Sequence, residues 1–462
     1  MLHYLPVKLA FIILLLFLNS RGRAQNLTQR LQDAILHLQQ DTQLKHSTIA
    51  LYVINGNTGE KVFDKNSETG LAPASCQKII TSVTAFELLG KQYIYKTKLG
   101  YTGIIQDGLL RGNVWIMGSG DPTLGSWRYP ITSDEAILTS FQKACKTLAP
   151  AGIQGTIHTN EWGLQSIPDG WIWQDIGNYY GAGAFAVNWR ENQFDIILHS
   201  GQRVGDTVSI TGIRPTGIYP LTFTNEITSA AEGSGDNGYI YIQPKVYAGY
   251  LKGTIPVKQN AFPISGALPD PGKLLSLELR RRLTIAQEPG IIQVADTPLH
   301  IFYTYVSPPL DSINYWFLKK SINLYGEAMV KTIAYEKSNS SETDTGVDII
   351  RNFWRVRGIE KASLKILDGS GLSPGNRVTP KALVSVLQYA KDKAWFPSFY
   401  YDLPLINGIK MKDGYINGVR SYSGYLNDLH GNNYIFSFII NNFDGDPVSI
   451  KEKMWKVLDL MK

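Results

Sequence analysis

The sequence predicts an α+β protein in which two regions of helices and strands enclose a long β-rich block. Apolar residues recur at helical spacing in residues 27–46 and again in several segments after residue 298. Between about 93 and 297 the chain instead has short β-like runs that glycine, proline, asparagine and aspartate interrupt. The chain has 462 residues, more than one hydrophobic core usually organises, so we expect two or three domains.

The first folded region is predicted to hold a helix, a hairpin and a second helix. Residues 27–46 are expected to form an amphipathic helix, and residues 47–66 a hairpin around the turn NGNTGE. A helix then starts at Pro73, because proline suits the first helical position and apolar residues follow at helical spacing. Gly90 is predicted to end it.

The rest of the chain divides into a β-rich block with little helix and a C-terminal region of helices and strands. Within the block, only residues 133–149 have the pattern of an amphipathic helix. Helices are expected again over 310–337 and 345–358. A hairpin follows, with its two strands joined by LHGN, and a final helix closes the chain at 447–462.

The amino terminus has the pattern of a secretory signal peptide. Lys8 precedes the apolar run FIILLLFL, and small residues follow at Gly22 and Ala24. We expect cleavage after Ala24, because the run is too short for a comfortable membrane span; an uncleaved anchor is the alternative. Removal of residues 1–24 takes away three basic residues and no acidic one, so the formal charge falls from +6 to +3. The mature protein is then mildly basic, without a stable membrane span.

Composition excludes several classes of function. A 44% hydrophobic and 18% charged chain is typical of a globular protein. The chain has no basic run with interleaved aromatic residues, so nucleic acid is not an expected partner.

Cys76 and Cys145 could form one disulfide in an exported protein, but a buried free thiol is favoured at Cys76. No cysteine or histidine cluster has the spacing of metal ligands, and we expect neither a metal nor a cofactor.

The segment APASCQK is the first candidate for chemistry. It places Ser75 and Lys78 three residues apart on one face of a helix start, where a serine nucleophile could find a lysine base. An ordinary helix start with an exposed lysine is the alternative. The same Ser-x-x-Lys pattern recurs at Ser140 and Lys143, which we predict to be a solvated helix face.

Two later motifs accompany the first one. Ser321 and Asn323 form a Ser-x-Asn element before a helical segment, and Lys412 and Gly414 form a Lys-x-Gly element in a strand-like stretch. A serine–lysine pair, then Ser-x-Asn, then Lys-x-Gly, in this order, resembles the active-site signature of serine β-lactamases and penicillin-binding proteins.

Longer stretches narrow the resemblance to one family. They are GSGDPTL at 118–124, residues 170–188, SPPL at 307–310, KKSINLYGE at 319–327 and DGSGLS at 368–373. From about 30 to 445 the chain is similar to the D-alanyl-D-alanine carboxypeptidase/endopeptidase family, the low-molecular-mass penicillin-binding proteins of the penicillin-binding protein 4 type. A second Ser-x-Asn lies at Ser312 and Asn314, but in the family a helix containing an acidic residue follows this motif, which matches the Ser321 copy. GSGDPTL and DGSGLS are predicted to be turns or structural loops.

The resemblance implies the fold class and the domains. It implies a serine β-lactamase/D,D-peptidase-like catalytic domain, with an antiparallel sheet flanked by helices, that a large, mainly β insertion interrupts. After the signal peptide, the catalytic domain would hold residues 25–92 and 298–462. The insertion would be residues 93–297, which we expect to hold two nested subdomains.

The resemblance also implies the mechanism. Ser75 would attack the carbonyl of the penultimate D-alanine and form an acyl-enzyme. Lys78 would be its base, provided that desolvation or nearby positive charge keeps it neutral. Ser321 would relay a proton to the leaving amine, and no cofactor is needed.

Substrate binding follows from the same comparison, with one departure. The residues implied for substrate binding are Asn323, Lys412, Asp413 and Gly414, and the backbone N–H groups of Ser75 and Tyr415 would form the oxyanion hole. The third motif of the family is Lys-Thr-Gly or Lys-Ser-Gly, whereas this chain has aspartate in the middle. That aspartate is expected to repel the substrate carboxylate.

The predicted function is that of an exported serine D,D-peptidase in the periplasm or cell envelope. It would cut D-alanyl-D-alanine and D-alanyl cross-links in peptidoglycan stem peptides, and β-lactams would acylate Ser75. The alternatives are a catalytically impaired peptidoglycan-binding protein, and a β-lactamase or esterase that uses the same site.

Overall fold

The computed structural model describes residues 27–163, 165–285 and 298–462. The predicted signal peptide lies outside the described residues. Within them, no helix combines the length and the apolarity that a membrane crossing requires. Contacts divide the chain into two compact units: the first comprises the residues up to Val83, Trp354–Ile366 and Asn376–Lys462, and the second comprises Thr84–Phe353 and Leu367–Gly375.

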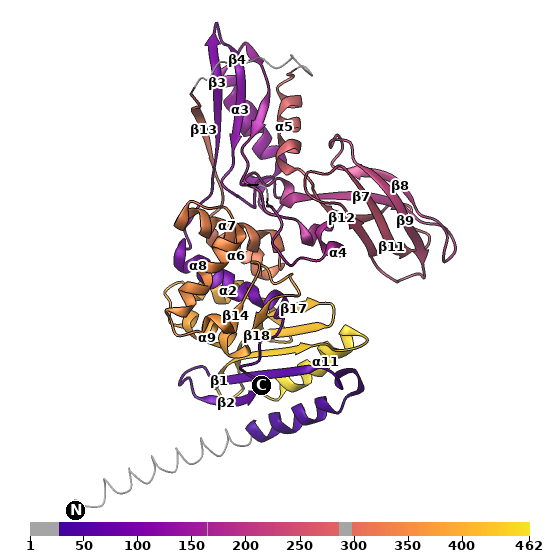
Figure 1. Ribbon diagram of the computed structural model, residues 1–462, viewed down its shortest axis with the longest axis vertical. Coiled ribbons are helices and arrows are strands. Elements are labelled where there is room, and N and C mark those ends of the chain that lie inside the picture. The colour runs from indigo at the N-terminus through magenta and orange to yellow at the C-terminus, as the bar shows by residue number, and fades with distance from the viewer. Residues whose placement is uncertain (1–26, 164, 286–297) are drawn as a thin grey trace, which may run out of the picture. The chain divides into compact units, whose positions relative to one another are not determined.

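The first unit is built on a six-stranded antiparallel sheet (Figure 1). In spatial order its strands are β16 (Leu405–Ile406), β17 (Ile409–Ile416), β18 (Val419–Asn427), β19 (Asn433–Asn441), β1 (Thr48–Asn55) and β2 (Lys61–Lys65). The two hairpins expected from the sequence are β1–β2 and β18–β19, and both predictions are confirmed.

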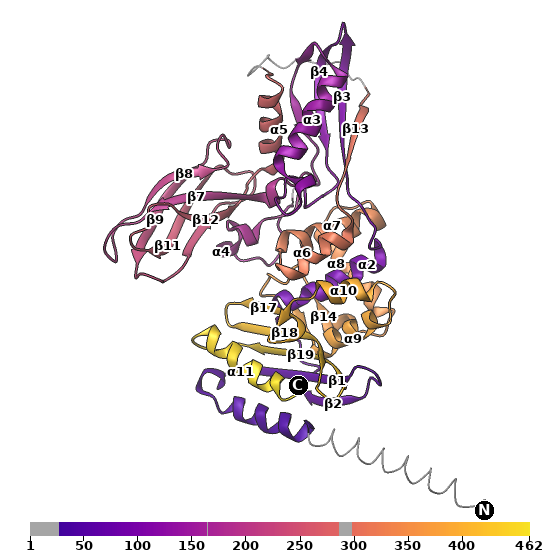
Figure 2. The ribbon, with the colours of Figure 1, turned by 180° about the vertical axis from the view of Figure 1, so that it is seen from behind.

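Helices cover both faces of this sheet. The helix at residues 27–39 and α11 (Pro447–Asp459) pack on one face through Leu31 and Met454, against Phe436 and Phe438 of β19. Figures 1 and 2 show these two helices side by side, near β1. The opposite face contacts α9 (Pro380–Lys391) and a short 3-10 helix, η2 (Ala74–Gln77). The unit also contains β14 (Leu364–Lys365), β15 (Arg377–Val378) and α10 (Phe396–Asp402).

The helix expected at Pro73 begins differently from the prediction. Its first turn is the 3-10 helix η2, and α2 (Lys78–Leu88) continues from it. Ala74, just before Ser75, has a φ of +44°, which is unfavourable for a residue with a Cβ atom. The predicted end is confirmed, because Gly90 adopts a φ of +85° after the last turn.

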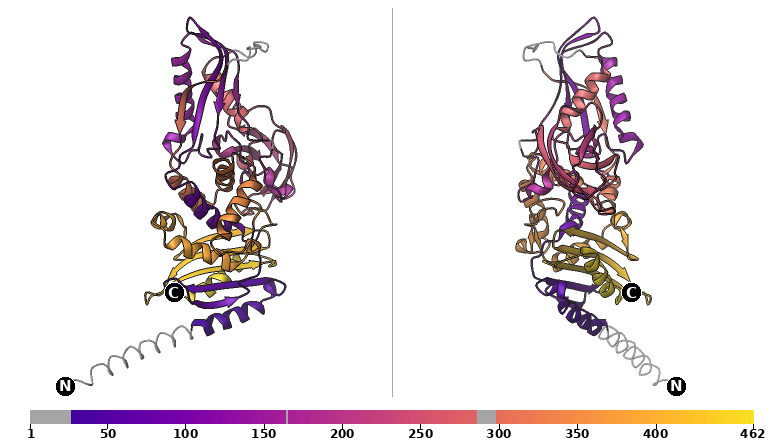
Figure 3. Two further views of the ribbon diagram at one scale, coloured as in Figure 1. Left: turned by 60° about the vertical axis from the view of Figure 1, so that its left-hand side comes forward. Right: turned by 90° about the vertical axis from the view of Figure 1, so that its right-hand side faces the viewer.

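The second unit has a five-stranded sheet with two helices (Figure 3). The strands are β13 (His300–Val306), β3 (Lys96–Gln106), β4 (Leu109–Met117), β5 (Gly152–Gln154) and β6 (Ile157–Thr159). The predicted helix over 133–149 is α3 (Asp134–Leu148). The block is mainly β as predicted, but α5 (Pro271–Arg282) was not identified from the sequence; it has Pro271 in its first turn and the Asp270 side chain as its N-cap.

Two three-stranded sheets and a helical part complete the second unit. The sheets are β12 (Phe262–Ala267), β7 (Gln193–His199) and β8 (Ser209–Arg214), and β10 (Asn237–Tyr241), β11 (Ala248–Pro256) and β9 (Thr222–Ala230). The helices are α4 (Trp173–Ile176), α6 (Leu310–Lys319), α7 (Asn323–Ser338) and most of α8 (Thr343–Arg355), so helix was correctly predicted after residue 298. The sequence predicts that residues 93–297 are inserted into the catalytic domain. These domain boundaries stay a prediction.

Candidate active site

Ser75 and Lys78 form a hydrogen-bonded pair at the junction of η2 and α2. A 3-10 helix has three residues per turn, so side chains three apart eclipse each other. The Nζ of Lys78 accordingly lies 2.9 Å from the Oγ of Ser75. Lys78 is fully buried whereas Ser75 is partly exposed. Burial disfavours the charged form of an amine, so the pair has the arrangement of an accessible nucleophile beside a sequestered base.

The second Ser-x-x-Lys copy has no such geometry. On α3, the Ser140 hydroxyl is 3.0 Å from the hydroxyl of Tyr303, and Lys143 is exposed. The prediction of a solvated helix face is therefore confirmed for this lysine. The difference arises from local structure, because Ser140 lies in a regular α-helix and Ser75 in a 3-10 turn.

Strand β17 runs directly against η2. The Ser421 hydroxyl on neighbouring β18 donates to the Pro73 carbonyl at 2.6 Å, and the Cys76 thiol donates to the Lys412 carbonyl at 3.2 Å. A Cβ atom at Gly414 would lie 2.7 Å from the Pro73 carbonyl oxygen and 2.8 Å from the Ser75 nitrogen. Glycine is therefore the residue that lets this strand approach the backbone of Ser75.

The N–H of Tyr415 points to the open edge of β17. The N–H of Met411 donates to the Pro404 carbonyl, on the side away from β18. Because N–H directions alternate along a strand, the N–H groups of Asp413 and Tyr415 point to that same edge. β16 pairs only with Ile409 and Lys410, so no described strand pairs with this edge at Tyr415.

Lys412 and Asp413 form an ion pair that sequence analysis missed. The Lys412 Nζ lies 2.9 Å from the Asp413 Oδ1 and 2.7 Å from its carbonyl oxygen. The lysine side chain is 1% exposed and the aspartate side chain 36%. Burial alone would raise the pKa of Asp413, but the charge and hydrogen bond of Lys412, with the charge of Arg420, outweigh it and lower the pKa. The negative charge of the Asp413 carboxylate is thus balanced by the Lys412 ammonium.

The direction of Asp413 also differs from that of its neighbours. Successive side chains on a strand point to opposite faces, and the Cβ direction of Gly414 is toward Ser75. Asp413 therefore leaves β17 on the face away from the Ser75 backbone. No sequence signal showed the contact with Lys412, because adjacent strand residues are not expected to pair.

Ser321 and Asn323 lie in the second unit, at the start of α7. Ser321 is partly exposed and has a φ of +57°, and the Asn323 side chain donates to the Tyr180 carbonyl at 2.8 Å. The competing copy lies inside α6, where Asn314 is fully buried. The structure thus brings Ser75, Lys78, Lys412 and Gly414 together within the first unit. Ser321 and Asn323 belong to the second unit.

The two cysteines are free and buried, so the disulfide alternative was wrong and the free thiol at Cys76 is confirmed. Burial raises the pKa of Cys76 to about 11 and that of Cys145 to about 12, so both thiols are unreactive at neutral pH. In the described ranges, no group of three histidine, cysteine, aspartate or glutamate side chains could hold a metal ion.

The family stretches GSGDPTL and DGSGLS form turns, as predicted. In DGSGLS the buried Asp368 accepts hydrogen bonds from the backbone N–H groups of Gly371 and Ser373. In GSGDPTL the buried Asp121 accepts from the N–H and the hydroxyl of Thr123. These carboxylates hold loops by local hydrogen bonds.

The fold and the hydrogen-bonded Ser75–Lys78 pair have the arrangement expected of a serine enzyme of the acyl-transfer class. The chain belongs to the D-Ala-D-Ala carboxypeptidase 3 (S13) family, whose model matches residues 31–409. It is 25% identical over 364 residues to the D-alanyl-D-alanine carboxypeptidase DacB of Haemophilus influenzae, covering 74% of this chain and 71% of the relative. It is 24% identical over 407 residues to the D-alanyl-D-alanine carboxypeptidase of Actinomadura sp. (strain R39), covering 81% and 69%.

A solved structure confirms the predicted fold class. Penicillin binding protein 4 (dacB) from Haemophilus influenzae superposes with a TM-score of 0.76 at 22% identity, covering 94% of this chain and 97% of that one. The same protein in complex with a β-lactam gives a TM-score of 0.72 at 21% identity, covering 95% and 99%. The family predicted from the motifs is confirmed separately, by the family model that matches residues 31–409.

Proposed function

We propose that Ser75 is the nucleophile of this enzyme and that Lys78 is its base. Family membership makes the chain a serine-type D-Ala-D-Ala carboxypeptidase, as predicted. The observation that carries the proposal is the 2.9 Å contact between the Ser75 Oγ and the Nζ of a fully buried lysine. Neutral Lys78 takes the hydroxyl proton while Oγ attacks the carbonyl carbon of the penultimate D-alanine.

The rest of the reaction follows from this attack. The carbonyl oxygen becomes an oxyanion, and the N–H groups of Ser75 and Tyr415 stabilise it. The approach of β17 to η2 at Gly414 and the outward direction of the Tyr415 N–H support this role. The C–N bond then breaks, the leaving amine takes a proton that Ser321 relays from Lys78, and water hydrolyses the acyl-enzyme.

Substrate binding involves Lys412 with Asp413, Gly414 and Asn323. Lys412 supplies the positive charge for the substrate carboxylate, and Asp413 moderates that charge through the ion pair. Gly414 leaves the edge of β17 open for the substrate backbone, and Asn323 hydrogen-bonds that backbone from its place at the start of α7.

The substrates are peptidoglycan stem peptides outside the cytoplasm. The enzyme is exported to the periplasm or cell envelope, with residues 1–24 as the cleaved leader. It releases the terminal D-alanine and also cuts D-alanyl cross-links, because both reactions break an amide of the same D-alanyl carbonyl. β-Lactams acylate Ser75 as substrate mimics.

Mass spectrometry of the intact protein after incubation with penicillin tests the nucleophile. We expect one penicillin adduct on the unaltered protein and none on Ser75→Ala. Ser140→Ala is the matched control, because it removes the serine of the other Ser-x-x-Lys copy, and it should form the adduct.

Two results would contradict the proposal. An adduct on Ser75→Ala would place the nucleophile elsewhere. No adduct on the unaltered protein would favour a catalytically impaired wall-binding protein. Released D-alanine and loss of cross-links, measured on purified peptidoglycan, separate the peptidase from a β-lactamase or esterase.

A further inference from the structure

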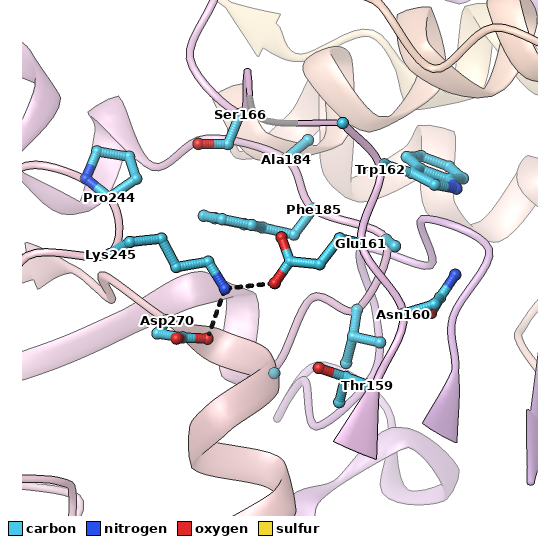
Figure 4. Close-up of a pocket in the computed structure, with 14 residues that line it drawn as sticks. Thr159, Asn160, Glu161, Trp162, Ser166, Ala184, Phe185, Pro244, Lys245 and Asp270 are labelled. Carbon is cyan, nitrogen blue, oxygen red and sulfur yellow. Dashed lines mark hydrogen bonds and ion pairs between the residues drawn. The ribbon is translucent and has the colours of Figure 1, made fainter. Parts of the chain in front are cut away.

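The second unit contains a cavity that has no part in the proposed chemistry. Its volume is about 500 Å³, and residues 159–163, Ser166 and residues 184–187 line it together with Lys245 and Asp270 (Figure 4). That volume lies within the range of sites that bury small molecules. No residue proposed above for catalysis or substrate binding lines this cavity.

A charged triad forms one side of the cavity. The Lys245 Nζ lies 2.7 Å from the Glu161 Oε1 and 3.1 Å from the Asp270 Oδ1, as the dashed lines in Figure 4 mark. Two carboxylates against one ammonium leave a net charge of −1. Within the described residues, the second carboxylate oxygen of Glu161 accepts no hydrogen bond. The site therefore favours a ligand rich in hydroxyl or N–H donors and disfavours an anion.

Aromatic rings and the Ser166 hydroxyl form the rest of the wall. Phe185 lies beside the triad, with its ring centre 5.8 Å from the Lys245 Nζ. Trp162 is 9% exposed and stacks on Tyr335 of α7 at 5.7 Å between ring centres, so its orientation is fixed. Ser166 is 7% exposed, and its hydroxyl has no hydrogen-bond partner in the part of the chain that the structure describes.

We propose that this cavity binds a hexosamine ring of the glycan strand that carries the stem peptides. A sugar ring combines apolar C–H faces, which pack on aromatic rings, with hydroxyl and N–H donors, which carboxylates accept. The cavity offers both kinds of partner on a neutral-to-negative surface. The inference rests on the proposed function, because a peptidoglycan peptidase meets its peptide and its glycan on one polymer.

Calorimetric titration of the full-length protein with a short N-acetylglucosamine oligosaccharide, which carries no charge, tests the site. The oligosaccharide should bind the unaltered protein. Glu161→Gln and Lys245→Met should each weaken binding by about tenfold or more, because each removes a charged partner of a sugar hydroxyl. Glu232→Gln is the matched control, because Glu232 is 80% exposed and does not line the cavity, and its affinity should equal that of the unaltered protein.

A second aromatic cluster in the same unit provides the competing site. Trp173 is 44% exposed and donates to the Tyr250 hydroxyl, and Tyr250 stacks on Tyr241. Loss of glycan binding in Trp173→Ala but not in Glu161→Gln would overturn the proposal. Absence of binding to the unaltered protein would also overturn it. Penicillin acylation reports the proposed activity separately, so a protein that forms the adduct without binding glycan refutes this inference alone.

Discussion

The surroundings of individual carboxyl side chains shift their pKa values in opposite directions in this protein. Asp413 is an ordinary carboxylate in the sequence, yet Lys412 and Arg420 lower its pKa in the fold. Asp121 shows the opposite case, because burial raises its pKa to about 6 despite hydrogen bonds from Thr123. The same residue type therefore has two different roles at neutral pH.

Replacement of Asp413 by threonine, the residue expected in the family motif, should strengthen substrate binding. It removes the anion that neutralises part of the Lys412 charge. The pair is partly exposed, so we expect only a roughly twofold to fivefold lower KM for a D-alanyl-D-alanine peptide. Because the pKa of Asp413 is lowered, the carboxylate is ionised throughout the range from pH 5 to 8, and the ratio of KM values should stay constant across it. A higher KM in the variant would contradict the ion-pair argument.

Asp121 should make the protein less stable as the pH rises. The group titrates near 3.8 in the unfolded chain and near 6 in the folded one, so the folded state holds the extra proton between these values. The free energy of unfolding therefore falls across this window, by roughly 3 kcal/mol in total. Asp121→Asn should remove this slope, which chemical unfolding at pH 4 and pH 7 would measure. Parallel pH profiles for the two proteins would contradict the prediction.

At the scale of elements, the site depends on how β17 meets η2. The hydrogen bonds from Ser421 and Cys76 hold the strand against the turn, and Gly414 leaves room for the contact. The 3-10 form of η2 eclipses Ser75 and Lys78. The geometry of the proposed site is thus set by one turn and one strand rather than by a long helix.

Gly414→Ala should reduce penicillin acylation by about tenfold or more. The added methyl group would lie within 3 Å of the Pro73 carbonyl oxygen and the Ser75 nitrogen, so β17 must move away from the nucleophile. Gly212→Ala is the control, because a Cβ atom there meets no atom within 4 Å. Acylation rates, with the melting temperature as a check of folding, measure the effect. Equal acylation rates for both variants would show that β17 accommodates a methyl group at position 414, which would contradict the prediction.

Many elements could be predicted from local patterns. The hairpins β1–β2 and β18–β19 and the final helix were visible because alternating or helical apolar spacing is a local property. α5 was missed although Asp270 and Pro271 are a standard helix start, because β-like runs surround it. The 3-10 turn at η2 could not be distinguished from the start of an α-helix, since both place residues i and i+3 on one face.

At the scale of the whole molecule, the proposed site residues come from both compact units. Ser75, Lys78, Lys412 and Gly414 belong to the first unit, whereas Ser321 belongs to the second. Each unit has its own core, one around the six-stranded sheet and one within the β-rich unit.

Ser321→Ala should lower the turnover number by roughly 100-fold or more, the scale of a lost proton-transfer group, with little change in KM. Ser312→Ala is the matched control, because it removes the serine of the other Ser-x-Asn copy inside α6. Stopped-flow acylation by a chromogenic β-lactam measures the step directly. Equal rates for Ser321→Ala and the unaltered protein would remove this serine from the mechanism.

The sequence by itself determined the family, the order of the motifs and the serine–lysine spacing, because these are properties of the linear chain and do not depend on how it folds. Tertiary structure alone decided that Lys78 is fully buried against Ser75, that Asp413 pairs with Lys412, and that a charged cavity forms around Lys245. Burial depends on segments that are distant in sequence, and no local pattern specifies how they pack. Lys412 and Asp413 are adjacent in the chain, but whether their side chains meet depends on the directions that the folded strand gives them.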